Sequence, residues 1–148
     1  MGKIVISGPQ NVSLDGVVQD PDGQEGFRLG GWFVQFGGKD LEEWNKVALA
    51  DALGAEAWLL GRRSYEFFGA RWRPRSGEIV VPASYQLGRT LIEHDLVDEL
   101  RLVVFPVVLG AGERLFDETS DKKPMRLVDA KTIGDGLAFL IYEFLAEA

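Results

Sequence analysis

The chain has 148 residues, with 16 Lys and Arg against 23 Asp and Glu, which gives a formal net charge of −7. This length, with a hydrophobic content of 46%, predicts one soluble globular domain over residues 1–148. The absence of cysteine excludes disulfides, thiolate metal sites and a cysteine nucleophile. The single histidine, His94, excludes a multi-histidine metal site within one chain, so we expect no metal. The pI of about 4.7 argues against nucleic acid as a partner, because that binding needs a dense basic surface.

The N-terminal apolar segment is too short to export the chain or to hold it in a membrane. Its hydrophobic run stops at Gly8 and Pro9, and no other apolar run approaches the roughly 18 residues of a membrane span. We therefore expect a cytoplasmic protein without membrane contact.

The first third of the sequence predicts a strand followed by a long irregular connection. Residues 4–7 form a β-branched run that Gly8 and Pro9 are expected to end. From there to Gly38, repeated Gly and Pro residues predict a loop, and long ordered loops often carry function. Its aromatic residues, Trp32 among them, must pack against the core, a partner or a ligand, and we favour the core or a subunit contact.

The middle of the chain alternates helices with strands. Asp40 is expected to cap an amphipathic helix that runs to Leu53 and ends at Gly54. Each of the two strands that follow leads directly into a helix, the first through a glycine turn. These strands are predicted at residues 56–60 and 78–82, and the helices at 61–69 and from 83 onward.

The last third is predicted to be mostly strand. One strand is expected over residues 99–108, and two more, 125–133 and 137–144, flank Gly134-Asp135-Gly136, a turn typical of a hairpin. Together with the alternating segments before them, these strands predict an α/β fold, a three-layer sandwich. Its sheet is mixed and mainly parallel, with a C-terminal antiparallel hairpin.

Two helix starts are candidate phosphate sites, because free backbone N–H groups at a helix N-terminus bind anions beyond the ends of parallel strands. The first is Gly61-Arg62-Arg63-Ser64, in which the glycine allows close approach, the arginines supply charge and the serine offers a hydroxyl. An ordinary helix start with two solvated arginines explains the same residues. The second, Ala83-Ser84-Tyr85, lacks paired glycines, and a simple cap by Ser84 explains it equally well.

Asp15 and His94 are two further polar candidates. Asp15 follows the first strand in Ser13-Leu14-Asp15-Gly16, where it either faces the crevice at the strand ends or begins an Asx turn before Gly16. We favour the turn. His94 ends a predicted helix beside acidic residues, so we expect a capping or surface role and assign it no chemistry.

Four segments taken together resemble one known superfamily. They are residues 13–16, 60–66 (Leu-Gly-Arg-Arg-Ser-Tyr-Glu), 96–100 (Leu-Val-Asp-Glu-Leu) and 106–116 (Pro-Val-Val-Leu-Gly-Ala-Gly-Glu-Arg-Leu-Phe). In this order they resemble the dihydrofolate-reductase-like superfamily. They are similar in particular to the C-terminal reductase domain of the bifunctional riboflavin-biosynthesis deaminase-reductase, from Lys3 to Tyr142.

The resemblance implies an oxidoreductase that transfers hydride from NADPH, or from NADH, to a small pterin- or pyrimidine-like substrate, in the manner of a 5-amino-6-(5-phosphoribosylamino)uracil reductase. It implies a catalytic part for Asp15 and a place for Trp32 in the wall of the substrate pocket. A homodimer is expected as well, because relatives often form one and exposed strand edges recruit partners. The residues implied in cofactor binding are Gly16, Gly61, Arg62, Arg63, Ser64, Ala83, Ser84 and Tyr85.

The chain departs from the family pattern in one respect. Residues 72–77 directly join the helix after Gly61 to the strand at 78–82, whereas relatives carry at least one more strand–helix–strand unit, roughly 30 residues or more. In relatives this unit helps to hold the adenosine end of the cofactor. The shortening leaves a second function open, a non-catalytic dimeric scaffold or binding protein that retains the fold but has lost the cofactor groove.

Overall fold

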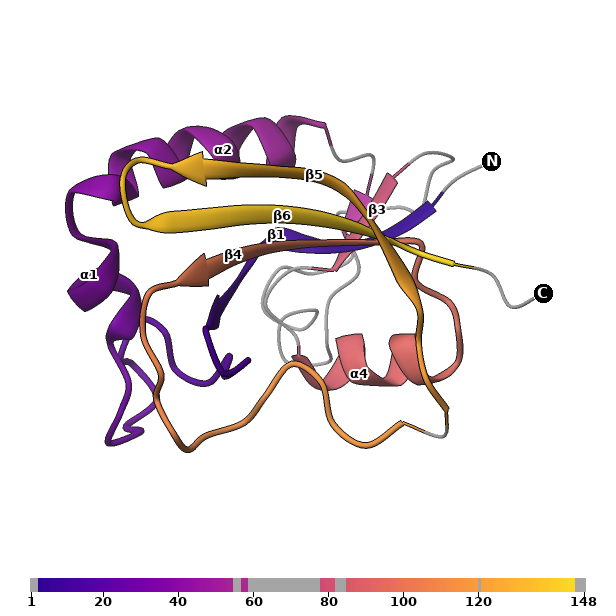
Figure 1. The fold of residues 1–148 in the computed structure, drawn as a ribbon, viewed down its shortest axis with the longest axis horizontal. Coiled ribbons are helices and arrows are strands. Elements are labelled where there is room, and N and C mark those ends of the chain that lie inside the picture. Colours follow the sequence, from indigo (N-terminus) through magenta and orange to yellow (C-terminus); the bar gives the residue numbers. More distant parts are fainter. Residues whose placement is uncertain (1–2, 55–56, 59–77, 82–84, 120, 146–148) are drawn as a thin grey trace.

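The computed structural model describes residues 3–54, 57–58, 78–81, 85–119 and 121–145 (Figure 1). Strands and helices alternate in the first part of the chain, and strands follow one another at its end. The elements in chain order are β1 (Lys3–Ser13), α1 (Trp32–Gly37), the 3₁₀ helix η1 (Gly38–Asp40), α2 (Leu41–Leu53), β2 (Ala57–Trp58), β3 (Glu78–Val81), α4 (Tyr85–Glu93), β4 (Glu99–Phe105), β5 (Met125–Ile133) and β6 (Leu137–Phe144).

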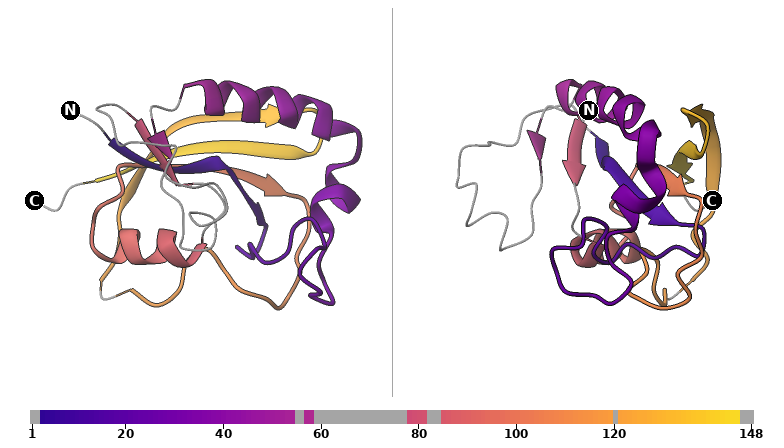
Figure 2. Two further views of the ribbon diagram at one scale, coloured as in Figure 1. Left: turned by 180° about the vertical axis from the view of Figure 1, so that it is seen from behind. Right: turned by 90° about the vertical axis from the view of Figure 1, so that its left-hand side faces the viewer.

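The strands form one mixed sheet in the order β2-β3-β1-β4-β6-β5. β1 pairs in parallel with both β3 and β4, and β2 pairs in parallel with β3. β6 is antiparallel to β4 and to β5, so the C-terminal pair is the predicted hairpin. α2 and α4 lie on opposite sides of this sheet, which makes three layers (Figures 1 and 2). The predicted fold class is therefore confirmed.

Two hydrophobic clusters join the helices to the two faces of the sheet. On the α4 side, Leu91 packs in one cluster with Leu100 and Leu102 of β4. On the α2 side, Trp32 packs in a second cluster with Val103 of the same strand. Neighbouring strand residues point to opposite faces, so β4 contributes to both clusters and is buried between the two helical layers.

The first strand continues beyond the point where the sequence predicts its end. Gly8 and Pro9 were expected to stop it, and this prediction is wrong, because β1 runs on to Ser13. The pairing of β1 with β4 shifts register between Ile6 and Gln10, so Gly8 and Pro9 fall in an irregular part of the ladder. A bulge accepts proline because the position there need not donate a ladder hydrogen bond.

The predicted loop up to Gly38 is only partly correct. Residues 14–31 do connect β1 to the next element without a helix or strand, but α1 begins at Trp32. This short helix lies between glycines at both caps, Gly31 and Gly38. Local propensity alone does not favour a six-residue helix, and the burial of Trp32 against the sheet stabilises it.

The start of α2 also differs from the sequence prediction, although its end does not. Asp40 is at the N-cap but makes no side-chain capping hydrogen bond. Its carboxylate instead accepts hydrogen bonds from the backbone N–H groups of Asp135 and Gly136, at 3.1 and 2.9 Å. Gly54 ends the helix as predicted, with its N–H 3.1 Å from the Ala50 carbonyl oxygen.

β4 ends at Phe105, earlier than the predicted residue 108. The helix predicted at 61–69 lies outside the described residues. Among the residues that are described, no helix has the length and apolar character to cross a bilayer, and no group of three or more acidic or histidine side chains is arranged to hold a metal.

Candidate active site

The carboxyl ends of the parallel strands β1, β3 and β4 lie at one edge of the sheet, which is where open α/β sheets bind ligands. Two long loops leave this edge, residues 14–31 after β1 and residues 106–124 after β4. Three residues separate the end of β3 from the start of α4, so the N-terminus of α4 belongs to the same edge. The candidate site is built from these three segments.

The two loops are hydrogen-bonded to each other through their backbones. The Leu14 N–H donates to the Val107 carbonyl at 2.8 Å, and the Leu115 N–H donates to the Gly16 carbonyl at 3.0 Å. Next to the second contact, an isolated antiparallel bridge joins Val17 to Arg114. We call residues 14–18 and 107–115 together the loop clasp. It makes the segment after β1 part of an ordered structure.

Asp15 is at the centre of the loop clasp. Its carboxylate accepts hydrogen bonds from the backbone N–H groups of Leu109 and Gly110, at 3.1 and 2.9 Å. The Ser13 hydroxyl donates a further bond of 2.6 Å. Arg114 donates from Nε to the Asp15 carbonyl at 3.0 Å, and its Nη2 lies 3.6 Å from the carboxylate. The carboxylate is thus surrounded by donors from the end of β1 and from the loop after β4.

These contacts fix the ionisation state of Asp15. Partial burial opposes the charge, but the hydrogen bonds from Ser13, Gly110 and Leu109 outweigh it and lower the pKa from 3.8 to about 2. At neutral pH the group is therefore an anion without a proton to donate. It can hold the loops together and place negative charge at this edge of the sheet.

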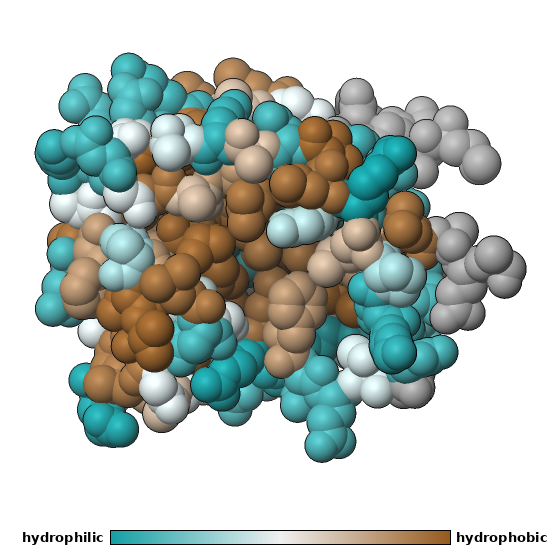
Figure 3. All heavy atoms as spheres, in the orientation of Figure 1, coloured by the Kyte–Doolittle hydropathy of each residue, from teal (hydrophilic) through white to brown (hydrophobic). Residues whose placement is uncertain are grey.

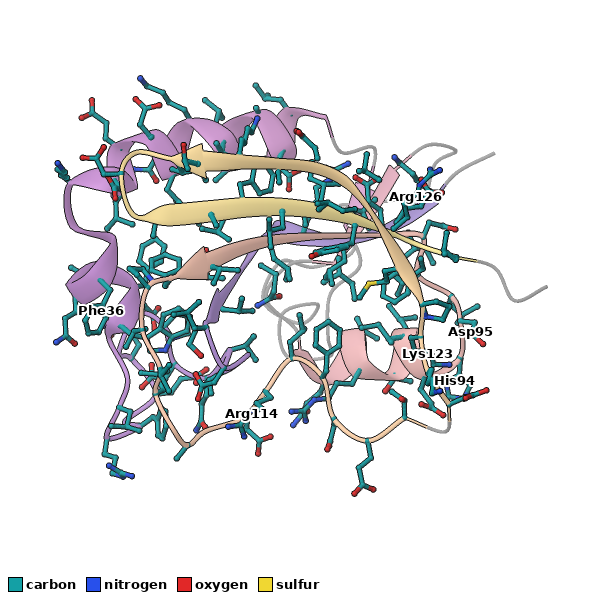
Figure 4. The ribbon with its side chains drawn as sticks, viewed as in Figure 1. Phe36, His94, Asp95, Arg114, Lys123 and Arg126 are labelled. Carbon is teal, nitrogen blue, oxygen red and sulfur yellow. The ribbon has the colours of Figure 1, made fainter. Side chains whose placement is uncertain are left out.

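Gly16 and Arg114 complete the turn beside Asp15. The Gly16 N–H bonds to the Ser13 carbonyl at 3.0 Å and its φ is 84°, a conformation that glycine adopts without strain. The chain does turn here through its backbone, but the Asx turn favoured for Asp15 is wrong, because the Val17 N–H that it would use donates to the Ser13 hydroxyl at 2.9 Å. Arg114 lies in the loop after β4, and its side chain is about half exposed (Figure 4). Sequence reasoning did not single it out, although it stands in the segment 106–116 that carries the resemblance.

Asp20 is a second residue that sequence reasoning missed. It is 1% exposed and adopts a φ of 50°, which is uncommon for a residue other than glycine. Its carboxylate accepts hydrogen bonds of 3.0 Å from the N–H groups of both Glu25 and Phe27. Gly30 packs so closely that a Cβ there would lie 2.3 Å from this carboxylate. Asp20 thus organises the rest of the loop after β1.

Trp32 is buried in the hydrophobic core. Its side chain is 0% exposed, its Nε1–H donates to the Gln19 carbonyl at 2.9 Å, and its ring meets the edge of Phe105 at 5.4 Å. This is the packing role that the sequence favoured for the aromatic residues of the segment. The place in the substrate pocket that the resemblance implies stays a prediction.

Most of the predicted cofactor residues lie outside the described part of the chain. These are Gly61, Arg62, Arg63, Ser64, Ala83 and Ser84, and of Tyr85 only the backbone at the start of α4 is described. α4 itself packs closely on the sheet, because Gly88 is buried and a Cβ there would lie 3.4 Å from Ile6. This packing holds α4 against β1, and the phosphate site at the helix start stays a prediction.

His94 lies at the opposite end of α4, away from the loop clasp (Figure 4). It is exposed, and its Nδ1 is 2.9 Å from the Thr90 carbonyl oxygen. Next to it, Lys123 forms an ion pair with Asp95 at 2.9 Å. These contacts agree with the expected surface role of His94.

Residues 71–139 match the family model of the RibD C-terminal domain. Among curated proteins, the uncharacterised protein YyaP of Bacillus subtilis strain 168 is 36% identical over 55 residues, which cover 37% of this chain and 29% of YyaP. The match thus spans less than a third of that relative's length.

Two solved structures have a similar fold. One is a Shewanella sp. PV-4 protein provisionally described as a riboflavin biosynthesis protein, with a TM-score of 0.69, 17% identity and coverage of 99% of this chain and 100% of the other. The other is dihydrofolate reductase from Enterococcus faecalis in complex with NADP(H), with a TM-score of 0.54, 12% identity and 95% coverage of both chains. The chain therefore has the dihydrofolate-reductase-like fold, and through residues 71–139 it resembles the RibD C-terminal reductase domain, as its sequence motifs predicted.

Proposed function

We propose that this chain is an NAD(P)H-dependent reductase that transfers hydride to a small pterin- or pyrimidine-like molecule. The observation that carries the proposal is the loop clasp, which orders the segment after β1 and contacts α4 through the 3.2 Å bond from Arg89 to Glu113. In a dihydrofolate-reductase-like fold, a reaction at this edge has an ordered loop on one side and a helix N-terminus on the other. The same fold in the Enterococcus faecalis enzyme carries NADP(H), which supports the choice of cofactor.

The cofactor would supply the hydride, and the chain would supply position and charge. Its phosphates would rest on the start of α4, at Ala83-Ser84-Tyr85, and on Gly61-Arg62-Arg63-Ser64, with Gly16 at the nicotinamide end. The described part of α4 fits this role, since Gly88 in its first half packs closely on Ile6 of β1 and holds the helix against the sheet. Asp15, ionised at neutral pH, would fix the loop that borders the site.

A calorimetric titration of the purified chain with NADPH tests the proposal. We expect saturable binding at micromolar concentration, and Arg62→Ala with Ser64→Ala to weaken it by on the order of 1–3 kcal/mol in total. Arg126→Ala is a matched control, because Arg126 is exposed and pairs with Glu143 on the distant C-terminal hairpin. Folded protein that binds no NADPH at millimolar concentration would overturn the proposal.

The second candidate is a non-catalytic dimeric scaffold or binding protein that retains the fold without the cofactor groove. One observation favours it: the donors around Asp15 all come from the chain itself, so this carboxylate is engaged without a ligand. Under this alternative, Arg62→Ala and Ser64→Ala change no affinity for NADPH. The same titration therefore separates the two functions.

The proposal has three further parts. The chain acts as one domain over residues 1–148, it works on a small molecule in the cytoplasm, and it forms a homodimer. The acidic charge and the absence of cysteine are compatible with the first two parts.

A further inference from the structure

Gln10 is a buried polar side chain near the carboxyl end of β1. It is 7% exposed and stands three residues before Ser13, the last residue of the strand. Within the described ranges, the structure gives its amide group no hydrogen-bond partner. Burying an amide without a partner costs free energy, so such groups usually have one. A bound ligand can supply the partner that the burial of Gln10 requires.

The Gln10 side chain points to the α4 side of the sheet. Neighbouring residues of a strand face opposite sides. Asn11 faces the α2 side, where its Oδ1 accepts a 2.8 Å hydrogen bond from Nε1 of Trp44. Val12, two residues after Gln10, belongs to the hydrophobic cluster on the α4 side. Gln10 therefore shares the face of Val12.

Along β1, Gln10 lies between the part under α4 and the part held by the loop clasp. Ile6, four residues before it, packs on α4, because a Cβ at Gly88 would lie 3.4 Å from its side chain. Ser13, three residues after it, donates its hydroxyl to Asp15 at 2.6 Å. The order of the sheet also reverses at β1, since β2 and β3 lie on one side of it and β4 lies on the other. Open α/β sheets bind ligands at such a reversal.

The same edge of the sheet exposes apolar side chains. Leu14 and Val108 of the loop clasp are 63% and 67% exposed. In Figure 3, which has the orientation of Figure 1, hydrophobic side chains reach the surface where β4 ends and the loop after it begins. A flat ring buries its faces against apolar side chains and is oriented by a few polar groups. This edge offers both kinds of contact.

We propose that the Gln10 amide binds the lactam edge of the substrate ring, which is a C=O group beside an N–H group. The proposal rests on the proposed reductase function and names the group that the site recognises. A carboxamide carries an acceptor, Oε1, beside a donor, Nε2, so it pairs with both atoms of a lactam at once. A ring without this edge leaves the amide unpaired and is rejected. Gln10 is therefore a specificity-determining residue for pterins and pyrimidinones that carry a lactam.

Two probes test the contact by calorimetry, pterin and 2-aminopyrimidin-4-one, each compared with its N3-methyl analogue. The methyl group removes the lactam N–H and leaves the rest of the ring. The wild-type chain should bind each parent compound at least about tenfold more tightly than its analogue. Gln10→Leu keeps the size of the side chain without the amide, so it should remove this preference.

Three results of these titrations would overturn the proposal. In the first, the wild-type chain binds neither parent compound at millimolar concentration. In the second, it binds parents and analogues equally. In the third, the preference for the parents persists in Gln10→Leu.

The stability of the ligand-free chain separates a ligand-binding role of Gln10 from a structural one. Gln10→Leu should raise the urea midpoint of unfolding, because leucine buries no unpaired polar group. A lower midpoint would mean that the amide holds the sheet together and would overturn the proposal. Asn11→Leu is the matched control, since the Asn11 amide already has Trp44 as its partner. This variant should lower the midpoint and retain the preference for the lactam.

NADPH carries an amide of its own, the carboxamide of the nicotinamide ring, with the same two kinds of atom. The NADPH titration, repeated on Gln10→Leu, separates this source from the substrate. Unchanged NADPH affinity supports contact with the substrate ring. Weaker NADPH affinity together with an intact lactam preference assigns Gln10 to the cofactor and overturns the proposal. A wild-type chain that binds no NADPH but selects the lactam through Gln10 would refute the reductase function alone.

Discussion

The carboxylate of Asp40 accepts a 2.9 Å hydrogen bond from the backbone N–H of Gly136, although the two residues are 96 positions apart. The contact joins the start of α2 to the turn between β5 and β6. A second bond of 3.1 Å reaches the same carboxylate from the N–H of Asp135. Asp40 is only 8% exposed, so water cannot readily replace these bonds.

Asp40→Ala should therefore destabilise the fold. Removing the carboxylate leaves two backbone donors without their acceptor, which costs about 2 kcal/mol of unfolding free energy. Urea denaturation checks the value, with Asp121→Ala as the control, since Asp121 is exposed and its carboxylate accepts a bond from the neighbouring Lys122 N–H. Equal stability of the two variants would show that the Asp40 contact contributes nothing.

Gly134→Ala should destabilise by more than its backbone conformation alone explains. Gly134 has a φ of 59°, and a Cβ there would lie 2.0 Å from the Asp40 carboxylate. Gly31 has a φ of 83° and a ψ of 10° with nothing within 4 Å of its Cβ position, so Gly31→Ala measures the cost of a left-handed conformation by itself. We expect losses of about 3 kcal/mol and about 1 kcal/mol for the two variants.

The double variant Asp40→Ala with Gly134→Ala gives an internal test of this clash. Once the carboxylate is gone, the new methyl group has space, so the double variant should be less destabilised than the two single losses added together. Additive losses would mean that the clash is relieved in another way.

Acidification should weaken the loop clasp through Asp15. The pKa of Asp15 is lowered from 3.8 to about 2 in the folded chain, so its stabilising contribution is present above pH 3.8 and is lost as the pH falls toward 2. Asp15→Asn should remove this contribution to the pH dependence of the unfolding free energy. The contributions of the other carboxyl groups should remain. Unfolding free energies of both proteins measured between pH 5 and pH 2 supply the comparison. Parallel pH profiles would argue against the shift.

Trp32→Phe should reduce stability without changing the affinity for NADPH. The change removes the hydrogen bond to the Gln19 carbonyl and leaves a gap in the buried cluster, for a loss of about 2 kcal/mol. Trp44→Phe is the matched control, because Trp44 also donates through Nε1, to Asn11 at 2.8 Å, but is only half-buried. A weaker NADPH affinity in a stable Trp32→Phe protein would instead place this side chain in the ligand site.

The order of strands and helices could be predicted from local sequence patterns, and the reasons are physical. β5 and β6 flank Gly134-Asp135-Gly136, a turn whose residues accept the backbone angles of a hairpin. Gly54 ends α2 because glycine is favoured after the last turn of a helix. In both cases the residues that decide the structure are neighbours in the sequence.

The errors arose where distant residues decide the structure. Asp40 is a residue type that often caps helices, but its carboxylate accepts hydrogen bonds from two N–H groups of the hairpin turn instead. Pro9 is typical of the end of a strand, but β1 continues past it because the pairing with β4 shifts register between Ile6 and Gln10. Asp15 was predicted from its place after β1. Two of the donors that lower its pKa, the N–H groups of Leu109 and Gly110, come from the loop after β4. No local pattern contains these partners.

The central position of β1 in the sheet has a consequence for how the chain folds during synthesis. Lys3 of β1 pairs with Glu78, and Val5 pairs with Glu99, so β1 leaves the ribosome long before either of its partner strands. Closing such long loops is slow, and an unpaired apolar strand can associate with other chains meanwhile. A nascent chain that stops before residue 78 would lack both neighbours of β1 and is therefore expected to be prone to aggregation.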